Sequence, residues 1–296
     1  MNIVINLNKT KDISSQQAVT RVKRLFTAKK AGHAGTLDPI ATGVLLICLN
    51  KATKIARFLS DLDKEYIVKL KLGESTDTYD SSGKITARGE LSSLNLYSSI
   101  EKVLSRFTGQ IEQVPPMYSA IKVSGKPLYK LARQGVAIER RPRKINIYSI
   151  DILGIDLPYI DIKVVCSKGT YIRTLCHDIG NELGVGAHMH SLVRTRIGNF
   201  KINDSASEEE IQVKACAQYS IDLALSHLQE VVFDENAYNK AKNGLPVNIS
   251  LFKTLEKDIS EKFFSERYVR LKSPDKRLFG IGKIQDKEIK IERFLN

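Results

Sequence analysis

The residues of this chain that could do chemistry are concentrated in residues 30–49, which read Lys-Ala-Gly-His-Ala-Gly-Thr-Leu-Asp-Pro-Ile-Ala-Thr-Gly-Val-Leu-Leu-Ile-Cys-Leu. This stretch holds His33 and Asp38 among three glycines and ends in an apolar run that predicts a buried strand. The Asp38-Pro39 step is rigid, because proline fixes its own φ and restricts the residue before it. A carboxylate on a rigid loop beside a core strand is a candidate nucleophile or general base, although Asp and Gly also form ordinary turns.

The segment from Gly32 to Gly43 resembles the active-site motif of the TruB family, the bacterial tRNA pseudouridine-55 synthases. Four further blocks resemble the same family in the same order, and they are residues 63–83, 109–123, 167–175 and 184–198. One short motif can arise by chance, whereas five in order are typical of a family member. These blocks lie within residues 3–200, and the resemblance of the remainder is diffuse.

The resemblance implies three catalytic residues, which are Asp38, Tyr66 and Arg173. The essential Asp of the family stands at the motif position of Asp38. Tyr66 matches a Tyr of the family's active site, which implies that it stacks on the uracil and is a candidate base for the C5 proton of that uracil. Without the resemblance, a lone Tyr in a strand is usually an ordinary core or edge residue. Arg173, expected in the first turn of a helix, is paired by the resemblance with the catalytic Asp, whose ionised form it would favour.

Five residues are expected to bind the substrate, namely His33, Tyr171, Asp80, Lys9 and Lys130. The family has a His at the position of His33 that helps to hold the flipped RNA out of its stack. Asp80 and Tyr171 lie in the second and fourth matching blocks. Lys9 matches the Lys of a Lys-Pro-x-Gly turn in the family, but here residues 9–12 read Lys-Thr-Lys-Asp, which leaves the rigidity of that turn open.

The charge of the chain predicts a polyanionic partner. The formal net charge is +13 and the isoelectric point is about 9.4, which most simply indicates nucleic acid. Residues 113–150 hold eight Lys and Arg but one acidic residue. Lys130 lies there, on a short basic helix expected between Pro127 and Gly135. Phosphate contacts from this segment would position an RNA without reading its sequence.

The elements expected to position these residues are short strands and amphipathic helices. Ser14 and Gln17 form a capping-box pattern at a helix start. Thr170 is expected to cap the helix that carries Arg173. Strands are predicted at residues 3–7, within 63–73, at 44–49 and at 159–166, and helices at 51–62, 96–107 and 127–135.

From about Glu230 the sequence changes character. A short helix at 235–243 is followed by Lys- and Glu-rich stretches and by strands at 268–271, 278–284 and 288–294. This part resembles the PUA-like C-terminal domain of the family. We therefore expect an α+β protein: a catalytic domain, residues 1–229, with a central mainly antiparallel sheet flanked by helices, and a small β-rich, PUA-like RNA-binding domain, residues 230–296.

No cofactor or metal is expected. Pseudouridine formation detaches uracil at N1, rotates it and rejoins it through C5, so the product is an isomer. The four cysteines form no CxxC pair, which favours buried thiols over a disulfide framework. His188 and His190 lack an acidic or Cys partner at a ligand spacing. The N-terminus lacks a signal-peptide pattern and no apolar run reaches membrane-spanning length, so a soluble, cytoplasmic protein is expected.

The resemblance implies that the chain isomerises the uridine at position 55 in the tRNA T-loop, acting on a flipped-out base as a monomer that requires no protein partner. Whether Asp38 attacks C1′, deprotonates C2′ to give a glycal or adds to C6 is open. Family members both modify and refold tRNA, which extends the expectation to assistance with tRNA folding. The alternatives are the catalytic subunit of a guide-RNA-directed complex, a non-enzymatic RNA-binding module and, more distantly, a metal hydrolase.

Overall fold

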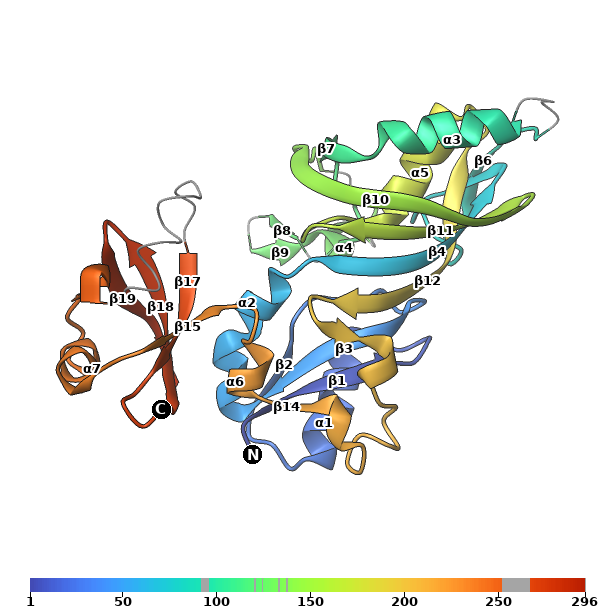
Figure 1. Cartoon of the computed structure of the whole chain (residues 1–296). Helices are drawn as coiled ribbons and strands as arrows, with labels where there is room; N and C mark the ends of the chain where they lie inside the picture. Colours follow the sequence, from blue (N-terminus) through green and yellow to red (C-terminus); the bar gives the residue numbers. More distant parts are fainter. Residues whose placement is uncertain are drawn as a thin grey trace.

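Ten strands of the described chain form one large sheet, and five form a smaller sheet near the C-terminus (Figure 1). The structure is a computed structural model that describes residues 1–91, 96–119, 121–123, 125–132, 134–136, 138–251 and 267–295. The path across the large sheet is β14 (Gln218–Ser220), β1 (Ile3–Lys9), β3 (Thr42–Leu49), β12 (Ala187–Ile197), β4 (Lys64–Leu72), β11 (Tyr159–Cys166), β10 (Arg143–Asp156) and β7 (Gly109–Gln113). In addition, β2 (Ala31–His33) pairs with β3, and β13 (Phe200–Lys201) pairs with β12.

One pairing near the middle of the large sheet differs from the rest. β12 runs parallel to β3, whereas the other strand pairs described in this sheet are antiparallel. Arg194 lies opposite Gly43 in this parallel pair. Gly43 has a φ of +98°, and a Cβ there would lie 2.3 Å from the Arg194 carbonyl oxygen, so only glycine allows the two strands to approach.

Both faces of β3 are buried, as the apolar run predicted. Leu45 and Ile47 face a core that includes α1 (Ser15–Leu25), α3 (Leu96–Arg106) and α5 (Ile172–Glu182). Leu46 and Cys48 face a second core with the 3₁₀ helix η1 (Asn50–Ile55), α2 (Ala56–Ser60) and α6 (Ile221–Ala224). The loop before β3 is therefore anchored in two cores at once.

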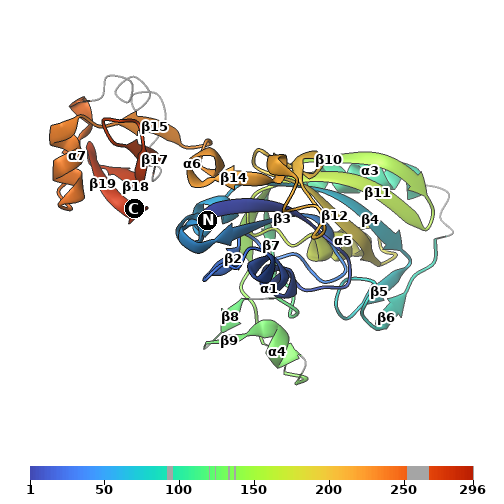
Figure 2. The same cartoon turned by 90° about the horizontal axis from the view of Figure 1, so that it is seen from below.

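Two small hairpins extend from the large sheet. β5 (Glu74–Thr76) pairs with β6 (Ile85–Arg88), and β8 (Lys122–Val123) pairs with β9 (Lys126–Pro127). The second hairpin continues into α4 (Leu128–Ala132), and Figure 2 shows this arm projecting away from the large sheet. Two 3₁₀ turns follow β13 along the chain, η2 (Ile202–Asp204) and η3 (Ala215–Ala217).

The smaller sheet has the order β15 (Gln229–Val232), β17 (Arg267–Lys272), β18 (Leu278–Gln285), β19 (Glu288–Phe294) and β16 (Val247–Asn248). It packs with α7 (Glu235–Lys242) around its own buried residues, which include Phe233 and Phe279, and η4 (Ile249–Leu251) follows β16. Figure 1 places this smaller sheet beside α2 and α6. The expected α+β fold with a β-rich C-terminal part is confirmed. The division at residues 229 and 230 stays a prediction.

Several local predictions hold and others are wrong. The Ser14 hydroxyl and the Gln17 side chain form the expected capping box at the start of α1. The single helix predicted at 51–62 is instead a 3₁₀ helix followed by the short α2. Thr170 does not cap α5: the N-cap residue is Tyr171, and the Thr170 hydroxyl donates to the Ser167 carbonyl at 3.0 Å.

Candidate active site

Asp38 lies on the loop between β2 and β3, and hydrogen bonds fix the backbone on both sides of it. The Ser15 hydroxyl donates to the Leu37 carbonyl at 2.9 Å and accepts from the Leu37 amide at 2.8 Å. On the other side, the Pro39 carbonyl accepts from the Lys9 ammonium at 3.3 Å. The Asp38 side chain is 31% exposed, so its carboxylate is held in place and can still be reached from outside.

Arg173 forms a two-point ion pair with Asp38, as the resemblance predicted for these two residues. The Arg173 Nε donates to Asp38 Oδ2 at 2.8 Å, and Nη2 donates to Oδ1 at 3.1 Å. The Arg173 side chain is 6% exposed and comes from the first turn of α5. A bidentate guanidinium–carboxylate pair fixes orientation as well as charge, so the Asp38 carboxylate has one defined direction.

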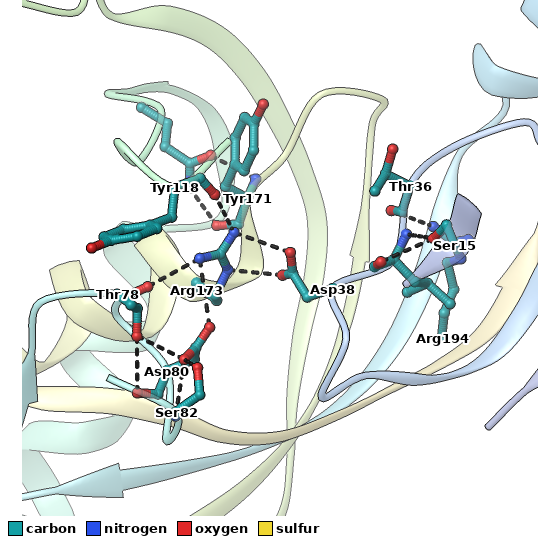
Figure 3. Close-up of polar contacts among 12 residues, drawn as sticks. Ser15, Thr36, Asp38, Thr78, Asp80, Ser82, Tyr118, Tyr171, Arg173 and Arg194 are labelled. Atoms are coloured by element: carbon teal, nitrogen blue, oxygen red, sulfur yellow. Dashed lines mark hydrogen bonds and ion pairs between the residues drawn. The ribbon is translucent and has the colours of Figure 1, made fainter. Parts of the chain in front are cut away.

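Three further contacts hold the guanidinium of Arg173 (Figure 3). Nη2 donates to the Tyr118 carbonyl at 2.8 Å and Nη1 to the Thr78 carbonyl at 3.1 Å. Asp80 Oδ2 lies 3.5 Å from Nη1, while Asp80 Oδ1 accepts from the Thr78 hydroxyl at 2.7 Å. Two carboxylates therefore share one guanidinium. Asp80 is 4% exposed and supports Arg173 from inside the protein.

Lys9 is fully buried, with no exposed surface. Its ammonium donates to the carbonyls of Thr10, Ile13 and Pro39, at 2.8, 2.9 and 3.3 Å. Burial lowers the pKa of Lys9 to about 8, although the charge of Asp38 acts in the opposite direction. In this arrangement Lys9 supports the loop that carries Asp38, and its predicted contact with substrate stays a prediction.

The turn after Lys9 is closed even though it lacks the Pro and Gly of the family pattern. Asp12, at the position of that Gly, has a φ of +65°, a left-handed conformation that Asp tolerates better than most residues. Its amide donates to the Pro39 carbonyl at 2.8 Å. The turn therefore reaches the loop of Asp38 by the same backbone geometry that a Gly would provide.

Tyr66 lies on β4, 7% exposed, directly opposite Arg194 of the antiparallel neighbour β12. Directly opposed side chains lie on the same face of a sheet. Burial raises the pKa of Tyr66 to about 12, against the opposing effect of the Arg194 charge. The phenol is therefore protonated at neutral pH.

Arg194 connects Tyr66 with the loop of Asp38, and the sequence analysis missed it. It is 1% exposed, and its guanidinium donates to the carbonyls of Val44, Gly35 and Thr36, at 2.7, 3.0 and 3.4 Å. The signal was present in the sequence, because Arg194 shares the inward side of its strand with the buried Leu192. An Arg at an inward strand position needs internal acceptors.

His33 ends β2, on the same loop as Asp38. Its Nδ1 atom is buried and has no hydrogen-bond partner among the described residues. Burial, assisted by the charge of Arg194, lowers the pKa of His33, so the imidazole is neutral at pH 7. The neighbouring Gly32 has no atom within 4 Å of a Cβ position, which leaves room beside the ring.

The other two residues predicted to bind the substrate, Tyr171 and Lys130, lie at different places relative to the Asp38–Arg173 pair. Tyr171 precedes Arg173 by two residues, and its backbone is held by Gln113: the Tyr171 amide donates to Gln113 Oε1 at 2.8 Å, and Gln113 Nε2 donates to the Tyr171 carbonyl at 3.0 Å. Lys130 is exposed on α4 of the projecting arm. The contacts described above for Asp38 and Arg173 do not include it. The contacts of Tyr171 and Lys130 with substrate stay predictions.

Other site types find little support in the described residues. No three His, Cys, Asp or Glu side chains among them are grouped so as to hold a metal ion. The four cysteines are free thiols, of which only Cys216 is exposed. Within the same residues, no helix has the length and apolar character needed to cross a membrane.

Comparison with known proteins gives consistent matches. Residues 23–172 match the family described as TruB family pseudouridylate synthase (N terminal domain), and residues 173–234 match the tRNA pseudouridylate synthase B C-terminal domain. The tRNA pseudouridine synthase B of Clostridium tetani is 45% identical over 288 residues, which cover 96% of this chain and 99% of that protein. That of Clostridium kluyveri is 44% identical over 294 residues, which cover 98% of each chain.

Among solved structures, a crystal structure of a Cbf5-Nop10-Gar1 complex matches with a TM-score of 0.74 and 26% identity, covering 99% of this chain and 85% of that one. A structure of an H/ACA RNP bound to a substrate RNA containing 2′-deoxyuridine matches in fold, with a TM-score of 0.70 and 24% identity over 99% of this chain and 85% of that one. The fold, together with a loop carboxylate paired to a buried arginine, defines a pseudouridylate synthase. The chain belongs to the TruB family of these enzymes, which confirms the resemblance of its motifs.

Proposed function

We propose that this enzyme converts the uridine at position 55 in the T-loop of tRNA into pseudouridine. The single observation that carries the proposal is the two-point Asp38–Arg173 ion pair on a loop that is fixed on both sides. Its relatives are named tRNA pseudouridine synthases, and the net charge of +13 suits a polyanionic substrate.

The reaction moves one bond and one proton. The C1′–N1 bond of the target uridine breaks, the uracil turns in place, a C1′–C5 bond forms, the C5 proton leaves, and N1 gains a proton. Asp38 acts as the nucleophile, and its attack on C1′, its removal of the C2′ proton and its addition to C6 are three paths that begin from the same carboxylate. Arg173 directs that carboxylate in each case.

Tyr66 lies flat against the uracil in this proposal, and such stacking contributes roughly 1–3 kcal/mol per base. Its phenol assists removal of the C5 proton in the phenolate form, which burial disfavours and the charge of Arg194 favours. Lys9 and Asp80, both predicted to bind the substrate, also position the site in this proposal, because both side chains are buried and bonded to protein atoms.

The target base reaches this pocket by leaving its stack, which costs a few kcal/mol. His33 occupies the space that the nucleotide vacates, and its neutral ring suits a place between stacked bases. Tyr171 lines the entrance next to Arg173. Lys130 and the other basic residues of the projecting arm contact the phosphates of the T-arm, which makes binding salt-dependent.

We further propose that the enzyme acts as a cytoplasmic monomer without a protein partner. The competing proposal is a guide-RNA-directed catalytic subunit, since one of the matching solved structures is a Cbf5-Nop10-Gar1 complex. The loop with His33 and the small C-terminal sheet favour the stand-alone form.

Tritium release tests the function directly. The substrate is unmodified tRNA transcribed with 5-tritiated uridine, with no other protein, in EDTA. Wild type should release tritium from one position, and Asp38→Asn should release none while it still binds the tRNA. Asp151→Asn is a matched control, because Asp151 is exposed and its carboxylate pairs with Lys163 at 3.1 Å, so the change should leave the rate unchanged.

A second transcript carries C in place of U at position 55. Tritium release by wild type from the first transcript but not from this one establishes both the reaction and its position. Tight binding without release would reject the enzymatic proposal and favour the RNA-binding module. Release that requires an added protein or guide RNA would favour the guide-directed alternative.

A further inference from the structure

The turn between β5 and β6 holds a residue to which neither the motif resemblance nor the proposed mechanism assigns a role. Tyr79 has a φ of +63°. A bulky side chain in the left-handed region is strained and persists only where the surroundings require it. The Tyr79 carbonyl accepts from the Met189 amide of β12 at 3.0 Å, so the backbone of the turn is fixed to the large sheet at this residue.

The ring of Tyr79 lies flat on His177 of α5. The ring centroids are 3.9 Å apart and the planes differ by 12°. His177 follows Arg173 by one helical turn, so the two side chains lie on the same face of α5. His177 is held in turn by Asn181, whose amide nitrogen lies 3.0 Å from Nε2.

The residues on either side of Tyr79 are the two that hold Arg173 Nη1. The Thr78 carbonyl accepts from Nη1 at 3.1 Å, and Asp80 Oδ2 lies 3.5 Å from it. Figure 3 shows Thr78 and Asp80 on the side of Arg173 away from Asp38. A change in the backbone of Tyr79 would therefore move both contacts at once.

We propose that Tyr79 is a positioning residue for catalysis: by stacking on His177 it fixes the turn against α5, and the turn fixes Arg173 on Asp38. This inference rests on the proposed function. Simple filling of space does not account for the geometry, because a Gly would form the same turn without the strain that a side chain meets at this φ. The strain is offset by the stack, and the stack is formed with the helix that carries Arg173.

The test compares four variants by single-turnover tritium release and by tRNA affinity. Tyr79→Ala and Tyr79→Gly should lower the rate constant about tenfold, which corresponds to about 1.4 kcal/mol, with tRNA affinity unchanged. Tyr79→Phe keeps the ring and should restore the rate to within about twofold of wild type. Tyr159→Ala is the control, since Tyr159 forms another Tyr–His pair, with His190, that does not involve Arg173.

Urea unfolding of the same variants separates positioning from stability. Tyr79→Gly relieves the strain and should unfold at a higher urea concentration than Tyr79→Ala, while both lose rate equally. A rate that follows stability across these variants, or wild-type rates in Tyr79→Ala, would overturn the proposal. If wild type itself releases no tritium, the proposed function fails, and a crystal structure of Tyr79→Ala then tests the positioning role of Tyr79 separately. An Arg173 Nη1 that still donates to the Thr78 carbonyl would reject this role, and a displaced guanidinium would support it.

Discussion

Replacing Arg173 by Lys tests whether the shape of the guanidinium, and not its charge alone, prepares Asp38. The guanidinium forms two hydrogen bonds with the Asp38 carboxylate. It also donates to the carbonyls of Tyr118 and Thr78 and lies close to the Asp80 carboxylate. A Lys ammonium is a single point charge and cannot make these contacts together. If it keeps only Asp38, two charge-assisted hydrogen bonds to carbonyls are lost, at roughly 1.5 kcal/mol each. The expected loss is about 3 kcal/mol, or about a hundredfold in rate.

Single-turnover tritium release at saturating enzyme measures this loss without a contribution from product release. Arg196→Lys is the matched control. Arg196 lies 3.7 Å from Glu65 and donates to the Gly198 carbonyl at 3.0 Å, and its side chain is 26% exposed. An ammonium can replace this simpler set of contacts, so the control should stay within about threefold of wild type.

A rate for Arg173→Lys within about fivefold of wild type would refute the reasoning, because charge alone would then suffice. An equal loss in both variants would mean that Arg-to-Lys changes in this sheet act through general stability. Urea unfolding of the two variants distinguishes that case from a local loss of orientation.

Two predictions concern the support of the loop. Gly43→Ala should lower the free energy of unfolding by about 2–5 kcal/mol, because the φ of +98° strains an Ala and the new Cβ meets the Arg194 carbonyl. Gly32→Ala is the control and should be nearly neutral, since no atom lies within 4 Å of a Cβ at that position. Equal urea midpoints for the two variants would contradict this prediction. The unfolded state binds more protons than the folded one between about pH 8 and 10.5, because the pKa of Lys9 is lowered from 10.5 to about 8. Stability should therefore rise with pH in this window relative to Lys9→Met, and parallel pH profiles of urea unfolding would contradict it.

The sequence predicted an element well where its determinants are close together in the chain. The capping box of α1 needs only Ser14 and Gln17, three residues apart, and both bonds are formed. The burial of β3 follows from its unbroken apolar run. The Asp38–Arg173 pair was predicted through the family motifs, since no local pattern connects residues 135 positions apart.

Predictions failed where a remote residue decides the outcome. Thr170 was expected to cap α5, but Gln113 takes the Tyr171 amide across 58 positions, and the Thr170 hydroxyl closes the turn before the helix instead. The burial of Lys9 and its hydrogen bond to the Pro39 carbonyl were not predicted, because Pro39 lies 30 positions away in the sequence. The partners of Arg194 are equally remote.

The parallel pairing of β3 with β12 has a consequence during synthesis of the chain. Arg194 leaves the ribosome 150 residues after Val44, whose carbonyl it binds, and at roughly 5–20 residues per second this interval lasts roughly 8–30 s. During that time the end of β3 near Gly43 is an uncovered strand edge, which is prone to pair with other chains. The nascent enzyme therefore carries Asp38 on an unfinished loop, and slowing of translation before β12 should raise its demand for chaperones.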